Sequence, residues 1–185
     1  FNAISVDGDT STSDTLALFS IDRKQINFNL NRNFAVLNRS LNLLMHDLSM
    51  KIIKDGEGLT KLIKLNVLNC KSKKQADNIS SSVINSPLVK TAISGEDANW
   101  GRIIAAIGKS EEKINQNKIK IMFGKYIVCQ KGAIYKRIND IKIKKYMKNK
   151  IIEITIKLNN GRFGRTVYGN DLSYEYIRIN ADYRS

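Results

Sequence analysis

Two segments in which apolar and polar residues alternate constrain the fold most strongly. The first covers Thr60–Leu68 and the second covers Ile152–Leu158, where Ile and Leu alternate with Glu, Thr and Lys. Because successive side chains of a strand point to opposite faces, each pattern predicts a strand with one buried face. Segments with the three- to four-residue period of helices lie before and between these strands. This order indicates a mixed α/β fold in which helices pack on a sheet.

The clearest helical pattern precedes the first strand. Its apolar residues recur at three- and four-residue steps and share one helix face; they are Phe34, Leu37, Leu41, Leu44, Met45 and Leu48. We expect this face to pack against the core. The polar, Asn-rich stretch before it, Asp22–Asn33, has no clear period and is interpreted as a loop.

Caps and turn residues predict the remaining elements. The first two predicted helices are one over 12–20, capped by Ser11 or Thr12, and one over 72–85, which stops before Pro87. A third helix covers 100–107, is capped by Asp97 or Asn99, and is ended by Gly108. The last helix is capped by Asn170-Asp171. The shorter strands are Ala3–Val6, Ile119–Phe123, Ile127–Cys129 and Arg162–Tyr168. Asn160-Gly161, between the last strand and Ile152–Leu158, predicts a hairpin.

The charge balance raises a second class of function. The 185 residues include 31 Lys and Arg against 17 Asp and Glu, a net charge of +14, so a basic nucleic-acid-binding module is the alternative hypothesis. The densest basic run contains only one aromatic residue, Tyr146, which favours a solvated face over a nucleic-acid site; its lysines are Lys142, Lys144, Lys145, Lys148 and Lys150.

Other features exclude several classes of protein. No stretch approaches the roughly 20 apolar residues of a membrane span, so we expect a soluble, cytoplasmic protein without a membrane partner. Cys70 and Cys129 lack the spacing of a zinc site or disulfide framework, so we expect buried, reduced thiols. No glycine-rich segment has the spacing of a phosphate loop, so no nucleotide cofactor is predicted.

Three features of the sequence are candidates for a metal-binding, catalytic or substrate-binding site. The acidic loop Asp7–Asp14 begins like a calcium loop, but its glycine is misplaced and its twelfth residue is Leu18; we interpret it as a turn and helix cap and predict no metal. His46, the single histidine, has no nucleophile motif beside it. Glu57 lies between two glycines, Gly56 and Gly58, in a turn that presents a carboxylate able to bind an ammonium group, although a plain surface turn explains the pattern as well.

Four strings in the same order as in a known family extend from the start of the chain to its end. They are Ser5-Val6-Asp7-Gly8-Asp9-Thr10-Ser11-Thr12, Asp55-Gly56-Glu57-Gly58, the segment 89–102 with Gly95-Glu96-Asp97-Ala98-Asn99-Trp100-Gly101-Arg102, and the terminal segment 171–185. With them the chain closely resembles the β chain of the ornithine acetyltransferase family, also called glutamate N-acetyltransferase or ArgJ-type enzymes. The resemblance implies a layered αββα sandwich with mixed sheets, of the DmpA/ornithine acetyltransferase type, with residues 1–185 as one structural unit.

The resemblance also implies an activity. Such enzymes move an acetyl group from N-acetylornithine to glutamate in the cyclic pathway of arginine biosynthesis, without a cofactor; some also accept acetyl-CoA as donor. The precursor cleaves itself before a threonine that carries the acetyl group. Phe1 is not that threonine, so we expect the nucleophile upstream of Phe1, no catalytic residue in this chain, and no activity of this fragment alone. The expected partner is the α chain of the same precursor, in an α2β2 heterotetramer.

Three positions of the family's substrate site carry over to this chain. They are Glu57 in the Gly-Glu-Gly turn, Asn180, and Ser185 at the end of the sequence. A carboxylate can accept hydrogen bonds from an amine, and an amide can hold a carboxylate or acetamide group. Because free termini are normally loose, the role of Ser185 requires an ordered C-terminus, which is a further expectation.

Overall fold

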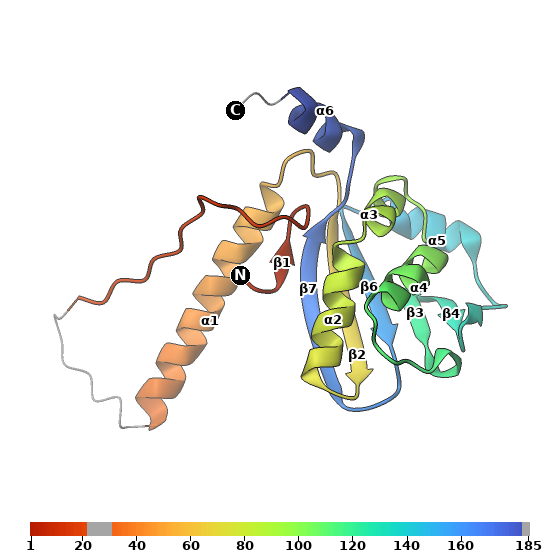
Figure 1. The fold of residues 1–185 in the computed structure, drawn as a ribbon, viewed down its shortest axis with the longest axis horizontal. Coiled ribbons are helices and arrows are strands. Elements are labelled where there is room, and N and C mark those ends of the chain that lie inside the picture. Colours follow the sequence, from red (N-terminus) through yellow and green to blue (C-terminus); the bar gives the residue numbers. More distant parts are fainter. Residues whose placement is uncertain (22–30, 183–185) are drawn as a thin grey trace.

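The computed structural model describes residues 1–21 and 31–182. In these residues a seven-stranded mixed sheet has the strand order β1-β7-β2-β6-β3-β4-β5 (Figure 1). The strands are β1 Ile4–Ser5, β2 Leu62–Cys70, β3 Lys120–Phe123, β4 Tyr126–Gln130, β5 Ala133–Ile134, β6 Ile151–Lys157 and β7 Phe163–Asn170. The helices are α1 Asn31–Lys54, α2 Lys73–Ile84, α3 Pro87–Ser94, α4 Trp100–Lys109, the 3-10 turn η1 Gln116–Lys118, α5 Asp140–Met147 and α6 Tyr174–Asp182. The expected α/β class with a mixed sheet is confirmed.

Strand β2 lies in the interior of the sheet, third in the strand order. It pairs in parallel with β6, where Leu65 lies opposite Ile154, and antiparallel with β7, where Leu65 lies opposite Val167. The alternating pattern correctly predicted both β2 and β6, since Ile63, Leu65 and their alternate neighbours are buried. A strand with an apolar face and partners on both edges is the expected occupant of a sheet centre.

The predicted hairpin at Asn160-Gly161 is wrong, because β6 and β7 are separated by β2. The connection instead wraps around the end of β2. The amide of Asn160 donates to the carbonyl of Asn69 at 2.9 Å, and a Cβ on Gly161 would lie 2.2 Å from the carbonyl oxygen of Cys70. Asn160 and Gly161 therefore allow the chain to pass close to the end of β2 on its way from β6 to β7.

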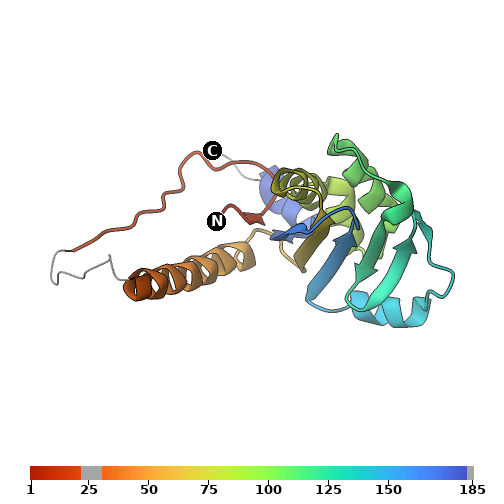
Figure 2. The ribbon, with the colours of Figure 1, turned by 90° about the horizontal axis from the view of Figure 1, so that it is seen from below.

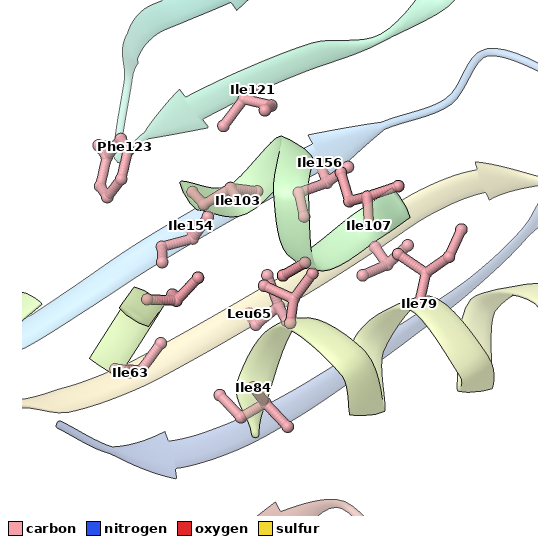
Figure 3. Packing of buried hydrophobic residues seen from close by; sticks show 14 of the residues in the cluster. Ile63, Leu65, Ile79, Ile84, Ile103, Ile107, Ile121, Phe123, Ile154 and Ile156 are labelled. Atoms are coloured by element: carbon pink, nitrogen blue, oxygen red, sulfur yellow. The ribbon is translucent and has the colours of Figure 1, made fainter. Parts of the chain in front are cut away.

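One face of the sheet carries the hydrophobic core. Figure 3 shows Ile79 of α2 and Ile103 and Ile107 of α4 packed over Leu65 and Ile156 of the sheet. All five side chains are buried, and burying an aliphatic side chain of this size contributes about 1.5–3 kcal/mol. These contacts anchor the helices on the sheet.

The alternate positions of β2, β6 and β7 form a polar, half-buried surface on the other face. The amide of Asn66 donates to Glu153 at 2.7 Å and accepts from the hydroxyl of Thr166 at 2.8 Å. Lys64 lies 3.6 Å from the same Glu153 carboxylate. This face is thus cross-linked by side-chain hydrogen bonds rather than filled by apolar groups.

Helix α1 forms as predicted, but the expected packing of its apolar face is wrong in the described part of the chain. Phe34 is 59% exposed and Leu44 is 52% exposed. Only its C-terminal end approaches the sheet, where Ile53 is buried and the helix contacts β1 and β7. Both ribbon views show the rest of α1 projecting away from the sheet (Figures 1 and 2).

The first helix predicted from the sequence, over 12–20, is also wrong. Ser11 accepts the backbone amides of Ser13 and Asp14, as a helix cap would, yet the chain continues without helical structure. Leu18 and Phe19 are exposed. A short helix needs an apolar face buried against a partner, and these residues have none among those described. Of the loop expected over Asp22–Asn33, positions 22–30 lie outside the described residues, and the last three positions begin α1.

Sequence analysis missed helix α3. Ser86 caps it by accepting the amide of Val89, and Pro87 occupies its first turn. A proline suits this position because its missing N–H would have no partner there. Gly108 does not end α4, which continues to Lys109. No helix in the described ranges is long and apolar enough to cross a membrane.

Candidate functional site

The Gly-Glu-Gly turn, Gly56–Gly58, lies between α1 and β2 and packs against the start of α6. A Cβ on Gly58, whose φ is +63°, would lie 2.2 Å from the backbone nitrogen of Tyr176. A Cβ on Gly56 would lie 1.7 Å from Nδ2 of Asn170. Both glycines are required by close approach, and between them the turn holds the exposed side chain of Glu57.

Ser173 joins this turn to α6. Its hydroxyl accepts the amide of Tyr176 at 3.2 Å and donates to the carbonyl of Gly58 at 2.6 Å. The predicted cap at Asn170-Asp171 is therefore wrong. The carboxylate of Asp171 instead accepts the backbone amides of Thr60 and Lys61, both at 2.9 Å, and the hydroxyl of Thr60. These bonds fix the end of the glycine turn to the connection between β7 and α6.

Two of the predicted site residues meet in the structure. Nδ2 of Asn180 donates to Oε2 of Glu57 at 3.0 Å and also to the carbonyl of Tyr176 at 3.0 Å. Both side chains are exposed, so a small molecule can reach them. Ser185 lies outside the described residues, and its role and the ordered C-terminus remain predictions.

Two residues that sequence analysis did not connect with the site, Asp7 and Tyr176, border this pair. The hydroxyl of Tyr176 donates to Oδ2 of Asp7 at 3.0 Å. Burial, the hydrogen bond to Asp7 and the charges of Asp7, Asp9 and Glu57 raise the pKa of Tyr176 to about 12. Three carboxylates therefore act on one position, and their combined field favours a cationic group such as an ammonium.

The acidic loop of the sequence thus has an additional role. The amide of Asp9 donates to Oδ1 of Asp7 at 3.0 Å, which confirms the predicted turn. The contact from Asp7 to Tyr176 spans 169 residues. Local turn chemistry carries no signal for a contact at that separation, and the sequence offered no other.

Lys90 lies beneath the site as a buried cation. The side chain is 1% exposed, and Nζ donates to the carbonyls of Val6 at 2.6 Å and Asn170 at 2.8 Å. Burial lowers the pKa of Lys90 to about 8, while the charges of Asp7 and Asp171 act in the opposite direction. The ammonium group thereby joins the segment after β1 to the end of β7.

The side-chain amide of Asn170 is buried beneath Gly56, and neither its nitrogen nor its oxygen has a hydrogen-bond partner in the described part of the chain. Such groups are rare, because an unpaired buried amide loses its bonds to water. The same close approach leaves no room for a Cβ at position 56.

The other candidates lie apart from this cluster. His46 is exposed on α1, and its ring centroid lies 5.8 Å from that of Tyr168. Cys70 and Cys129 are free and buried, and burial raises the pKa of both thiols, that of Cys70 to about 11. The described residues contain no group of three or more His, Cys, Asp or Glu that could hold a metal. The lysine run lies on α5 and just after it, where all five lysines are exposed.

Comparisons with known proteins agree over the whole chain. A model of the ArgJ family matches residues 1–185. The chain is 39% identical to the arginine biosynthesis bifunctional protein ArgJ of Caulobacter vibrioides, over 100% of this chain and 47% of that protein. It is 43% identical to ArgJ 2 of Clostridium acetobutylicum, over 99% of this chain and 46% of that protein. The chain therefore spans slightly less than half the length of these curated relatives.

A solved structure shows the same arrangement. The crystal structure of the arginine biosynthesis bifunctional protein ArgJ from Bacillus halodurans matches with a TM-score of 0.90 and 36% sequence identity. The match covers 99% of this chain and 87% of that chain.

Proposed function

The chain belongs to the ArgJ family, and from this membership we propose that the whole protein transfers an acetyl group from N-acetylornithine to glutamate in arginine biosynthesis. The observation in this chain that carries the proposal is the contact between Glu57 and Asn180 at an exposed, acidic position. Both residues were expected in the substrate site, and they meet although 123 residues separate them in the sequence.

The chemistry of the pair suits an amino-acid substrate. The carboxylate of Glu57 can accept charge-assisted hydrogen bonds from an ammonium group, and Asp7 and Asp9 add to the negative field there. The amide of Asn180 can donate to a carboxylate or accept from an acetamide N–H. Ser185 is proposed as a third binding residue. These residues bind and orient the substrate and take no part in bond making.

The reacting oxygen is proposed to belong to a threonine outside this chain. Its hydroxyl attacks the acetyl carbonyl of N-acetylornithine, the C–N bond breaks, and ornithine leaves with a proton. The amine of glutamate then attacks the acetyl-threonine, the ester C–O bond breaks, and a proton of the amine passes to the threonine oxygen, which restores the hydroxyl and releases N-acetylglutamate. Acetyl-CoA can supply the same acetyl group as an alternative donor, and no other cofactor is needed.

The rest of the precursor is the proposed partner. The apolar face of α1 is exposed and the polar face of the sheet is only half-buried in the described structure, and the relatives contain as much sequence again beyond the matched part. A large exposed apolar stripe is unusual in a monomer. We expect the other half of the precursor, as an α chain, to cover both surfaces and to supply the second sheet of the αββα sandwich. Two such pairs form the proposed α2β2 heterotetramer in the cytoplasm.

The full precursor tests this function. Purified protein is incubated with N-acetylornithine and isotope-labelled glutamate, and products are measured by mass spectrometry. We expect equal amounts of ornithine and labelled N-acetylglutamate, and a threonine-bound acetyl group after incubation with N-acetylornithine alone. A precursor that is folded and self-cleaved but produces neither would contradict the proposal. Salt-sensitive binding to nucleic acid without acetyl exchange would favour the alternative module.

A further inference from the structure

Helix α6, which carries Asn180, packs only weakly against the rest of the protein. None of its residues is buried, and Figure 1 shows it above the end of β7, away from the helices that cover the sheet. Its attachments are polar: Ser173 to Gly58 before its first residue, Tyr176 to Asp7, and Asn180 to Glu57. Because no side chain of α6 is fully buried, these polar bonds contribute strongly to its orientation.

Tyr176 takes part in most of these attachments. Its backbone N–H donates to the capping hydroxyl of Ser173, and its backbone nitrogen lies close to Gly58. Its carbonyl receives the amide of Asn180, one helical turn later, and its hydroxyl donates to Asp7. Through Tyr176, therefore, Asn180 is connected both to the glycine turn and to the segment after β1.

Asp7 is a fixed anchor for that hydroxyl. Its other carboxylate oxygen accepts the amide of Asp9, and the carbonyl of the preceding residue, Val6, accepts from the buried ammonium of Lys90 at 2.6 Å. Asp7 is therefore connected, through Val6, to the buried side chain of Lys90, whereas no residue of α6 is buried.

We propose that Tyr176 is a positioning residue whose hydrogen bond to Asp7 holds α6 in the orientation that keeps Asn180 against Glu57. The bonds from Ser173 lie at the start of the helix and leave it free to pivot about that point. The bond to Asp7 supplies a second point of attachment and prevents this rotation. The inference rests on the proposed function, because Asn180 and Glu57 must be the substrate-binding pair for the orientation to affect turnover.

The first test replaces the hydroxyl alone, in the full precursor. Tyr176→Phe should raise KM for glutamate and N-acetylornithine about tenfold, as expected for losing a hydrogen bond to a charged group, while kcat stays within about twofold because the reacting oxygen is untouched. The matched control is Tyr174→Phe on the same helix, where the side chain is 93% exposed; it should leave both constants unchanged. Equal kinetics of the two variants would overturn the proposal.

The second test asks whether the two residues act as one unit. Asp7→Ala should raise KM at least as much as Tyr176→Phe does, and the double variant should be no worse than the poorer single variant. Asp7→Asn keeps an acceptor oxygen for Tyr176, so it should recover the part of the affinity that depends on the orientation of α6, but not the part due to the charge of Asp7. Additive losses in the double variant would show independent roles and overturn the proposal. If the unmodified precursor shows no acetyl exchange, the proposed function itself fails, whatever these variants do.

Discussion

Asn180 and Glu57 are joined by a hydrogen bond of 3.0 Å across 123 residues of sequence. The acid comes from the glycine turn before β2, and the amide comes from the last described helix. The turn touches the backbone of that helix directly at Gly58, so the geometry of the pair depends on contacts that neither residue makes itself.

Removing the charge of Glu57 should weaken substrate binding. Glu57→Gln keeps an oxygen that can accept from Asn180 but cannot pair with an ammonium, so we expect KM to rise by at least about tenfold in the full precursor. Melting temperature should not change, because the side chain is exposed. Steady-state kinetics check this, with the exposed Glu111→Gln as control. An unaltered KM would remove Glu57 from the substrate site.

Two truncations separate the roles of Asn180 and Ser185. Removing Asn180–Ser185 from the precursor should raise KM steeply, because it deletes the amide that faces Glu57. Removing only 183–185 should leave that amide in place and report on the last three residues, and Ser185→Ala then isolates the serine hydroxyl. Kinetics of both shortened proteins are compared with those of the intact enzyme, and unchanged values in the longer deletion would contradict the site.

Gly58→Ala should displace α6. The new methyl group would overlap the backbone of Tyr176, and φ of +63° is strained for alanine, at a cost of about 1–3 kcal/mol. The matched control is Gly108→Ala inside α4, where no atom lies within 4 Å of the added group; it should stabilise the protein by about 0.5–1 kcal/mol. Thermal unfolding of the two variants should shift in opposite directions.

The charge of Lys90 predicts a dependence of stability on pH. Because burial lowers its pKa from 10.5 to about 8, the unfolded chain binds more protons than the folded one between these values. The contribution of Lys90 to stability should therefore rise with pH from about 8 to 10.5. We expect the melting temperature of the unmodified precursor, relative to that of Lys90→Met, to rise over this range. A constant difference would show that the fold does not lower the pKa of Lys90.

The exposed face of α1 should be needed for assembly. Leu44→Asp places a charge in the apolar stripe and should weaken association of the two parts of the precursor, measured by size-exclusion chromatography after self-cleavage. Arg39→Asp changes the charge of the same helix at another exposed position and serves as control. Intact assembly of the leucine variant would show that this face is not the contact surface.

The sequence pattern correctly predicted those elements whose structure depends on residues close by in the sequence. The alternation around Ile154 and Leu65 identified both strands, and Asn99, one of the two predicted caps, begins α4. The helix predicted from Ser72 is α2, for which Ser72 is the cap. The pattern failed at Asn160, because a turn motif does not show that β2 will take both strands as partners.

Some residues of the candidate site could be identified from the sequence, and others only from the structure. Glu57 and Asn180 were identified by resemblance, and their contact is a finding of the structure. Asp7 and Tyr176 meet only through the three-dimensional fold. Lys90 lay within a string that was used for its resemblance, and nothing in the local pattern distinguished a buried lysine from an exposed one.

The central position of β2 has a consequence for how the polypeptide acquires its structure. Both of its neighbours, β6 and β7, are synthesised long after it. During translation the two edges of β2 therefore stay unpaired until β6 and β7 have emerged from the ribosome, whereas α2 and α4 are made soon enough to cover its apolar face. High separation of contacting strands slows folding and favours aggregation of intermediates. Growth at elevated temperature or limiting chaperone should accordingly reduce the yield of this protein more than that of a helical protein of equal length.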